Sequence, residues 1–279
     1  MIRQFSLVNA KGYRYNLNDL DFFMYDPDDL GYKKSNKIIK AGNVFKSYQE
    51  SISQPTPTGT IRFKNPDAYQ KYYEFMRFAT VEPLILEYTP GDSKDTFKMD
   101  CYISKIEKSE ISGSGLHCEV KFGALSFWYK TYVMQVGIDV DNGKIYDYTY
   151  PFRYSDTAAG TVALDVDSSM ESPTIISIFG PVENPVWNHY VNNILVDSGL
   201  CNVEVVQGHV LVIDCASVPF QITEQDMLGN VIYDRYPLSD MSTERFIFLH
   251  NGHNRLSVAH DGAMIPRLKV EARVLYETV

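Results

Sequence analysis

The 279-residue sequence lacks long apolar runs and an excess of basic residues, and each absence excludes a class of protein. A bilayer-spanning helix needs about 20 apolar residues, whereas the longest apolar runs, such as Thr174–Phe179, are far shorter. No long apolar segment follows the first residues, so we expect no signal peptide. Lys and Arg number 26 against 35 Asp and Glu, a net charge of −9, which argues against nucleic acid because phosphate binding relies on clustered cations. We expect a soluble, cytosolically made chain with no membrane or nucleic-acid partner.

Cysteine is scarce, and its spacing does not suggest metal or redox chemistry. The four cysteines are Cys101, Cys118, Cys201 and Cys215, and none forms a C-x-x-C pair. Asn202–Val206 and His209–Asp214 have the pattern of two strands joined by a two-residue turn. Side chains alternate faces along a strand, so this hairpin places Cys201 and Cys215 on opposite sides. We therefore expect four free thiols that pack as small hydrophobic side chains.

Common catalytic signatures are also missing. The sequence has no G-x-S-x-G, no H-E-x-x-H and no G-x-G-x-x-G. The segment from Gly137 to Lys144 approaches a phosphate-binding loop, but it has one residue too many between its glycines. Ile145 also stands where a Mg²⁺-binding hydroxyl is required. We expect no enzyme activity, no catalytic residue and no cofactor.

What the sequence does contain indicates a mainly β protein, a β-rich α+β chain. Aromatic residues make up 13% of it and recur in alternating patterns, which suit the half-buried surface of a strand. The alternation in Leu116–Phe122, together with Met99–Ile111 and the turn-forming Ser112–Gly115, predicts a hairpin. Gly42–Ser53 and Thr58–Phe63 predict a second hairpin.

The second predicted hairpin has an unusual tip. Gln54-Pro55-Thr56-Pro57 forms a stiff segment that cannot join a strand ladder, so we expect it to be exposed. The polar segment Tyr25–Lys40 that precedes this hairpin is expected to form a long loop.

One helix is predicted, after residue 65. Asn65 suits the N-cap and Pro66 the first helical position. An apolar stripe with helical spacing follows and fades by Thr80; it consists of Tyr69, Tyr72, Tyr73 and Met76. Leu84–Tyr88 then returns to a strand pattern.

The length suggests about two domains, with a boundary after Val140. We therefore expect a domain of residues 1–140 with the helix and hairpins, and a second domain of residues 141–279. The second domain has short strand patterns at intervals of roughly 8–12 residues, which is typical of a β-sandwich. The predicted strands are Thr161–Val166, Thr174–Phe179, Val191–Asp197, Asn202–Val206, His209–Asp214, Phe220–Thr223, Asn230–Asp234, Arg245–Leu249, Arg255–Ala259 and Arg267–Tyr276.

Two clusters resemble metal sites without completing one. His250 and His253 form an H-x-x-H, to which His260 or Asp261 would have to add a ligand. The intervening Asn-Gly favours a hydrogen-bonded turn instead. Asp139–Asn142 begins like a calcium loop, but Gly and Glu are missing at the required positions. We expect no bound metal.

Two further function classes stay open from individual residues. Trp187 and Tyr190 are candidate glycan contacts, for a carbohydrate-binding protein that recognises the bacterial wall, although Trp187 also suits a core position. Asp165 and Asp167 lie on one strand face, where paired carboxylates of a β-sandwich glycoside hydrolase would stand.

Seven segments, taken in order, carry a resemblance to a known family. They are Phe5–Asn18, Leu30–Tyr32, Thr58–Phe63, the tyrosine-rich Tyr69–Phe75, Leu84–Tyr88, Phe127–Tyr129 and the aromatic, proline-containing Tyr148–Tyr154. Together they resemble the distal tail proteins (Dit) of long-tailed siphophages over most of the chain. The Gln54–Thr58 and Tyr25–Lys40 segments depart from the family pattern.

The resemblance implies a virion structural protein. Its members form a homo-hexamer, in which the N-terminal domains make a ring at the end of the tail tube and a galectin-like β-sandwich projects outward. The implied partners are the tail tube protein, the tail-associated hub protein, and receptor-binding or baseplate proteins. The implied location is the distal end of the phage tail, after assembly in the host cytoplasm. The family pattern carries over no sugar site.

Edge strands of such a domain pair readily with a neighbouring chain, and head-to-tail contacts that close under rotation generate rings. We therefore expect one hairpin, either Gly42–Phe63 or Met99–Phe122, to cross to the adjacent subunit. The sequence does not decide between them.

Overall fold

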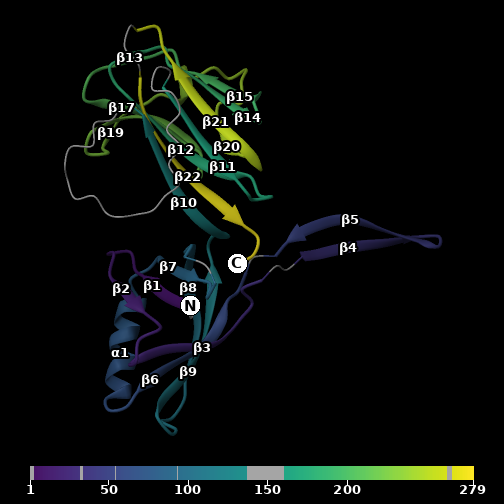
Figure 1. Ribbon diagram of the computed structural model, residues 1–279, viewed down its shortest axis with the longest axis vertical. Helices are drawn as coiled ribbons and strands as arrows, with labels where there is room; N and C mark the ends of the chain where they lie inside the picture. The colour runs from purple at the N-terminus through teal and green to yellow at the C-terminus, as the bar shows by residue number, and fades with distance from the viewer. Residues whose placement is uncertain (1–2, 32–33, 54, 93, 137–159, 263–265) are drawn as a thin grey trace. The chain divides into compact units, whose positions relative to one another are not determined.

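The computed structural model describes residues 3–31, 34–53, 55–92, 94–136, 160–262 and 266–279 (Figure 1). The chain forms two compact units, one of Met1–Lys130 with Tyr276–Val279 and the other of Thr131–Leu275. We call them the N-terminal unit and the C-terminal unit. Strands dominate both, which confirms the predicted mainly β fold. The predicted phosphate-loop and calcium-loop look-alikes, the boundary at Val140 and the segment Tyr148–Tyr154 lie outside the described residues.

An antiparallel sheet forms the body of the N-terminal unit. Its strands, in order across the sheet, are β2 (Arg14–Asn16), β1 (Gln4–Val8), β7 (Leu84–Thr89), β8 (Phe97–Lys108), β9 (Gly115–Ala124), β6 (Thr58–Lys64) and β3 (Phe22–Asp28). A further strand, β10 (Trp128–Val136), pairs with β8 through Tyr129 and Lys98. The predicted strand Leu84–Tyr88 is confirmed as β7.

The hairpin predicted from Met99–Ile111 and Leu116–Phe122 is confirmed. Strands β8 and β9 pair antiparallel from Cys101 and Ala124 to Lys108 and Cys118. The alternate apolar side chains of β9 are buried in the core, while Glu119 is exposed on the other face. The period-two pattern therefore identified both the strand and the face that it buries.

The predicted helix is present as α1 (Ala68–Ala79), but it begins later than the sequence suggested. Asn65 does not cap it, because the Asn65 N–H donates to the Ser114 carbonyl and so extends the β6–β9 ladder. Asp67, with a left-handed φ of 67°, precedes the first helical residue instead. The chain therefore changes direction between Asn65, which is still bonded to the sheet, and Ala68, where the helix begins.

The predicted stripe of the helix is also shifted. Tyr73 is 52% exposed, whereas Phe75 and Ala79 are buried. The Phe75 ring lies 5.4 Å from the ring of Tyr15 and 5.7 Å from the ring of Phe63. The helix therefore covers the sheet through Phe75 and its neighbours one turn away, and it leaves Tyr73 at the surface.

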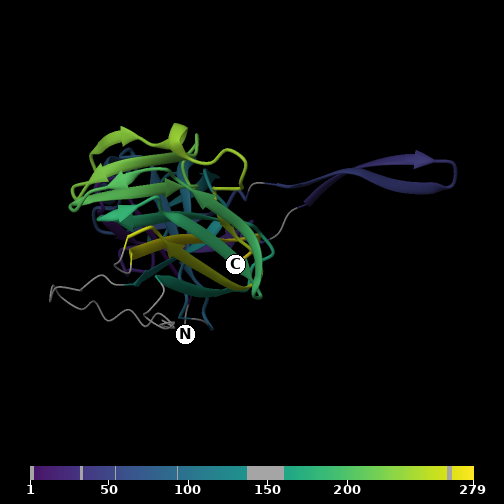
Figure 2. The ribbon, with the colours of Figure 1, turned by 90° about the horizontal axis from the view of Figure 1, so that it is seen from above.

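Two strands of the N-terminal unit stand apart from its sheet. Strands β4 (Lys34–Ala41) and β5 (Val44–Ile52) pair only with each other among the described strands, around a Gly42–Asn43 turn in which Gly42 has a φ of 65°. Figures 1 and 2 show them running side by side with no other strand next to them. We call this hairpin the arm.

The arm corrects two predictions. Gly42–Ser53 does not pair with Thr58–Phe63, and Tyr25–Lys40 is not one long loop, because its second half is β4 and its beginning belongs to β3. Strand β6 is already occupied on both sides by β3 and β9. The expected exposed tip is also wrong, since Pro55 and Pro57 are buried and the Pro57 carbonyl accepts a hydrogen bond from the Phe122 N–H.

The C-terminal unit contains two antiparallel sheets (Figure 1). One has the order β19 (Val231–Asp234), β18 (Gln221–Asp226), β17 (His209–Asp214), β12 (Ser172–Phe179), β22 (Arg267–Tyr276). The other has the order β11 (Thr161–Val166), β21 (Gly252–Ala259), β14 (Val186–Val191), β15 (Ile194–Leu200). Short elements complete the unit: β13 (Val182–Glu183), β16 (Glu204–Val205), β20 (Phe248–Leu249) and the 3₁₀ helix η2 (Tyr236–Leu238). Nine of the ten predicted strands each overlap one of these strands. The tenth, Val191–Asp197, includes the end of β14 and the beginning of β15.

Val191–Asp197 spans a turn, because Asn192 and Asn193 both adopt positive φ and separate β14 from β15. The predicted hairpin of Asn202–Val206 with His209–Asp214 is also wrong. Strand β16 pairs with β13, and β17 pairs with β12 and β18.

The cysteines nevertheless pack as predicted. All four are buried and free. Burial raises the pKa of the Cys101 thiol to about 12 and that of the Cys201 and Cys215 thiols to about 11, because a charged thiolate is poorly solvated there.

No helix in the described segments has an apolar stretch long enough to cross a bilayer, and α1 has 12 residues in all.

Candidate functional site

Trp187 lies in the core of the C-terminal unit. It is 0% exposed, and its indole N–H donates to the Arg245 carbonyl at 2.9 Å. Gly199 lies against the ring so closely that a Cβ there would be 2.3 Å from it. The geometry favours the core position that the sequence also allowed, because a ring without exposed surface cannot stack on a sugar from solvent.

Tyr190, the other candidate glycan contact, is half-buried on β14. The guanidinium of Arg255 lies 4.4 Å from the centre of its ring. This cation–π contact covers one of the two faces of the Tyr190 ring.

The histidines of the H-x-x-H do not converge. His253 Nδ1 pairs with Asp165 at 2.6 Å, whereas the His250 ring stacks on His189 at 5.9 Å. His260 Nδ1 accepts from the Gly262 N–H. Asp261 accepts from the Asn184 amide. Within the described segments, no group of three or more His, Cys, Asp or Glu is placed to hold a metal.

The two aspartates proposed for a glycoside hydrolase lie at the exposed end of β11. The Asp165 carboxylate is held by His253, in an ion pair at the surface. Asp167 follows the strand and is exposed as well. Neither carboxylate is enclosed in the apolar surroundings that a glycosidase general acid needs.

The arm presents the most unusual surface of the N-terminal unit. Four of its apolar side chains are at least half exposed: Ile38 at 61%, Ile39 at 52%, Val44 at 56% and Phe45 at 68%. The register Lys40–Phe45 and Ile39–Lys46 places apolar residues on both faces of the hairpin. Among the side chains of the arm that the structure describes, neither face is buried. An isolated two-stranded hairpin is at best marginally stable in water.

The arm is also basic in an acidic chain. Residues 34–52 contain four lysines, Lys34, Lys37, Lys40 and Lys46, against Glu50, a net charge of +3. The remainder of the chain therefore has a net charge of −9 − 3 = −12.

An acidic groove of about 420 Å³ lies on the sheet of the same unit. Its charged lining residues are Asp26, Asp28, Glu107 and Glu119, with Lys105 and Lys121. Glu107 and Glu119 are direct cross-strand partners on β8 and β9, and like charges in that position repel. Lys105 forms an ion pair with Glu107, so part of this repulsion is compensated.

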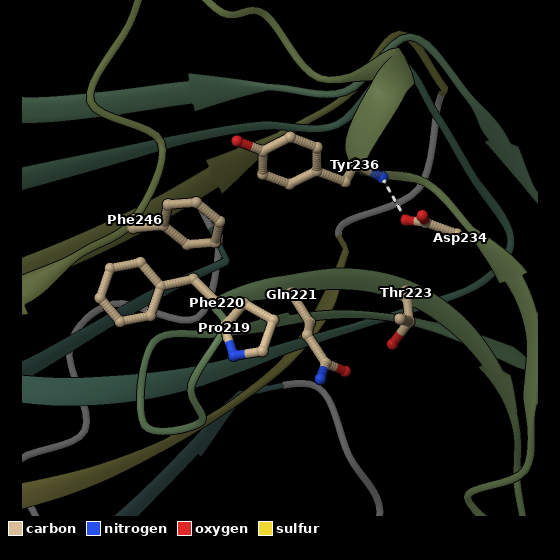
Figure 3. Close-up of a pocket in the computed structure, with 7 residues that line it drawn as sticks. All are labelled: Pro219, Phe220, Gln221, Thr223, Asp234, Tyr236 and Phe246. Carbon is tan, nitrogen blue, oxygen red and sulfur yellow. Dashed lines mark hydrogen bonds between the residues drawn. The ribbon is translucent and has the colours of Figure 1, made fainter.

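A second pocket, of about 610 Å³, lies on the C-terminal unit (Figure 3). Its lining residues are Pro219, Phe220, Gln221, Thr223, Asp234, Tyr236 and Phe246. They come from the segment just before β18, from β18 itself, from the end of β19, from η2 and from the segment before β20. Sequence reasoning missed this pocket because its three aromatic rings are far apart in the chain and share no motif.

The C-terminal unit also buries charged groups that the sequence did not reveal. Glu224 is 2% exposed and is held by Arg235 Nη2 at 2.6 Å and His209 Nδ1 at 2.5 Å. His189 is 0% exposed, between Asp197 at 2.9 Å and Asn254 at 3.0 Å. Both networks satisfy the polar groups that they bury, which is the condition for a stable polar core.

Comparisons with known proteins identify the N-terminal unit. Residues 4–125 match the family model described as the distal tail protein, N-terminal domain. No curated protein matches the sequence at a significant level.

Solved structures share the fold over the whole chain. A chain of the phage P2 baseplate in its activated conformation with Ca has a TM-score of 0.63 and 16% identity, and the match covers 100% of both chains. The same baseplate with Sr gives a TM-score of 0.62 and 16% identity, again over 100% of both. The SPP1 Dit (gp 19.1) protein has a TM-score of 0.63 and 9% identity, and the match covers 96% of this chain and 98% of that one. Residues 4–125 therefore belong to the distal tail protein family as its N-terminal domain, which confirms the resemblance that the sequence predicts.

Proposed function

We propose that this chain is a structural protein of a long-tailed bacteriophage, located at the distal end of the virion tail. It assembles as a homo-hexameric ring that joins the tail tube protein to the tail-associated hub and to receptor-binding or baseplate proteins. The family match of residues 4–125 supports this proposal. The solved relatives support it too, because one is part of a phage baseplate and another is described as a paradigm of the hub of an adsorption apparatus.

The arm is the single observation that carries the proposal of self-assembly. Its apolar side chains, with Phe45 at 68%, are left exposed by the rest of the described chain, and burial of such side chains contributes about 1.5–3 kcal/mol each. A second copy of the chain supplies the missing cover. Neither hairpin that the sequence left open is the crossing element in this proposal: Gly42–Phe63 does not form a hairpin, and β8 and β9 are already paired within the sheet. The arm, which contains residues 42–52 of the first candidate, crosses to the neighbour instead.

The acidic groove is the receiving surface for the arm. Its facing Glu107 and Glu119 gain a counter-charge when lysines of the neighbouring arm approach. Since the donor arm and the receiving groove are different surfaces of one chain, each copy gives and receives once. Such heterologous contacts close into a ring when the rotation between copies is a fraction of a full turn.

The C-terminal unit holds the attachment partners in this proposal. Residues 141–279 form a galectin-like sandwich that projects from a ring made by residues 1–140. The virion protein is assembled in the host cytoplasm, uses no cofactor, and makes or breaks no covalent bond.

Native mass spectrometry of the purified full chain tests the proposal. We expect a six-copy particle, and we expect a variant whose residues 34–52 are replaced by a short Gly-Ser linker to remain folded but dissociated. A full chain that stays monomeric at every concentration contradicts the proposal. A hexamer that survives loss of the arm contradicts only the role given to the arm.

A further inference from the structure

The pocket of about 610 Å³ on the C-terminal unit, which we call the aromatic pocket, has an apolar wall of three aromatic rings. The centre of the Phe246 ring lies 5.1 Å from that of Phe220 and 6.1 Å from that of Tyr236. The rings of Phe246 and Tyr236 are nearly parallel, with an angle of 23° between their planes. Arg245 Nη2 donates to the Tyr236 hydroxyl at 2.8 Å, which fixes the orientation of that ring. Phe220 remains 42% exposed, so the wall is open to solvent rather than part of the core.

The opposite side of the pocket is polar (Figure 3). Thr223 and Asp234 are direct cross-strand partners on β18 and β19, and so their side chains share one face of the sheet. Gln221 lies two residues before Thr223 on the same strand and therefore on the same face. Three side chains with amide, hydroxyl and carboxylate groups thus line one pocket with three aromatic rings.

These polar groups are held in place while keeping free hydrogen-bonding capacity. The Tyr236 backbone N–H donates to Asp234 Oδ1 at 3.0 Å, which orients the carboxylate. Thr223 Oγ1 accepts from the Gln225 amide at 3.0 Å, so its own O–H is available as a donor. The pocket volume of about 610 Å³ falls within the ~300–1,000 Å³ typical of small-molecule sites.

A pyranose sugar has the chemistry that matches this pocket. One face of its ring carries C–H groups that pack against aromatic rings, and its hydroxyls both donate and accept hydrogen bonds, as Gln221, Thr223 and Asp234 require. The single Asp234 carboxylate repels anions. The nearby Arg245 guanidinium is engaged with the Tyr236 hydroxyl and with backbone carbonyls, and it covers one face of the Tyr236 ring at 4.9 Å and one face of the Phe246 ring at 5.5 Å. We propose that this pocket binds a neutral saccharide, with its ring against Phe220, Tyr236 and Phe246. This inference is independent of the proposed assembly, because no residue of the arm or the acidic groove takes part.

Saturation-transfer NMR on the full chain tests the inference with individual sugars as probes. The probes are glucose, galactose, rhamnose, N-acetylglucosamine and N-acetylgalactosamine, with glucuronic acid as the anionic comparison. We expect transfer to the C–H face of at least one neutral sugar, and weaker transfer to glucuronic acid. The absence of transfer to every neutral sugar overturns the proposal.

Variants separate the pocket from the rest of the surface. We expect Phe220→Ala and Asp234→Asn each to weaken binding of the responding sugar by about tenfold or more. Leu228→Ala is the matched control, since Leu228 is 88% exposed near the same strands but does not line the pocket. Thermal unfolding of each variant checks that it is folded. Unchanged sugar binding by folded Phe220→Ala overturns the proposal, as does preferential binding of a proline-rich peptide that displaces the sugar.

Discussion

The body of the N-terminal unit and its arm use the same kind of strand pairing, but they treat apolar side chains in opposite ways. In β9, Leu116 and Phe122 are 0% exposed, because β9 lies within a sheet that α1 covers on one face. In the arm, Phe45 is 68% exposed and Ile38 is 61% exposed. The difference teaches that strand pairing alone does not bury apolar side chains: the body buries its apolar face within the chain, whereas the apolar side chains of the arm stay exposed.

The strongest test of this comparison removes one aromatic ring from each region. We expect Phe75→Ala to lower the free energy of unfolding of the N-terminal unit by about 3–5 kcal/mol, because it leaves a cavity among Tyr15 and Phe63. Phe45→Ala is the matched change in the arm. Its effect on the unfolding of the dissociated chain is expected to stay below about 0.5 kcal/mol, since the ring is already exposed. Chemical denaturation measures both, and an equal loss in the two variants contradicts the division between body and arm.

A smaller effect is expected from charge reversal between the arm and the acidic groove. Glu119→Lys places a cation in the groove and is expected to weaken assembly by roughly tenfold, or about 1.4 kcal/mol. Adding Lys40→Glu on the arm restores part of that loss by re-forming an opposite-charge contact. Analytical ultracentrifugation at low and high salt measures the change, with Glu74→Lys on the exposed side of α1 as the control. If the Glu119→Lys variant associates as strongly as the wild-type chain, the groove is not the receiving surface.

The smallest expected effect concerns thiol reactivity. The reactive form of cysteine is the thiolate, and burial raises the pKa of Cys101 to about 12. At pH 8 the four native thiols are therefore expected to resist iodoacetamide until the chain unfolds. Ser47→Cys on the exposed arm is expected to react at once in the dissociated chain and slowly after assembly. Mass spectrometry of labelled chains reads both results.

The same thiols set a limit on stability at high pH. A thiol with a folded-state pKa raised above its ordinary value of 9.0 favours the fold while it is protonated. This contribution is present below pH 9 and is lost as the pH rises toward 11–12. A thermal unfolding midpoint that rises over this pH range contradicts the buried position of the thiols.

Sequence patterns predicted elements whose environment is simple. The alternation in β9 and the bounds of β22 followed from period-two burial, since one side of each strand faces a core. The first strand of the arm, β4, and its pairing with β5 escaped prediction, because lysines and apolar residues lie on both faces of the arm and no clear alternation exists. The turn at Asn192–Asn193 escaped because apolar residues flank it on both sides and make the segment resemble one strand.

Sites that depend on tertiary contacts were not predictable. Trp187 was a reasonable candidate from its type, but the strand that carries it points its ring into the core. The aromatic pocket joins Phe220, Tyr236 and Phe246, whose spacing in the sequence has no period that a motif search would detect. The family resemblance, by contrast, was recognisable, because it depends on the order of many local segments rather than on contacts between them.

Residues Tyr276–Val279 pack on the N-terminal unit, although about 145 residues of the other unit separate them from Lys130 in the sequence. Tyr276 packs on Phe97 with ring centres 5.2 Å apart, and Lys130 lies 5.0 Å from the Tyr276 ring. Val279 also contacts the core of that unit. A polypeptide released early, before Tyr276, leaves these contacts unmade however well its first 130 residues fold. Removal of Tyr276–Val279 is therefore expected to destabilise the N-terminal unit although these residues lie far from it in the sequence.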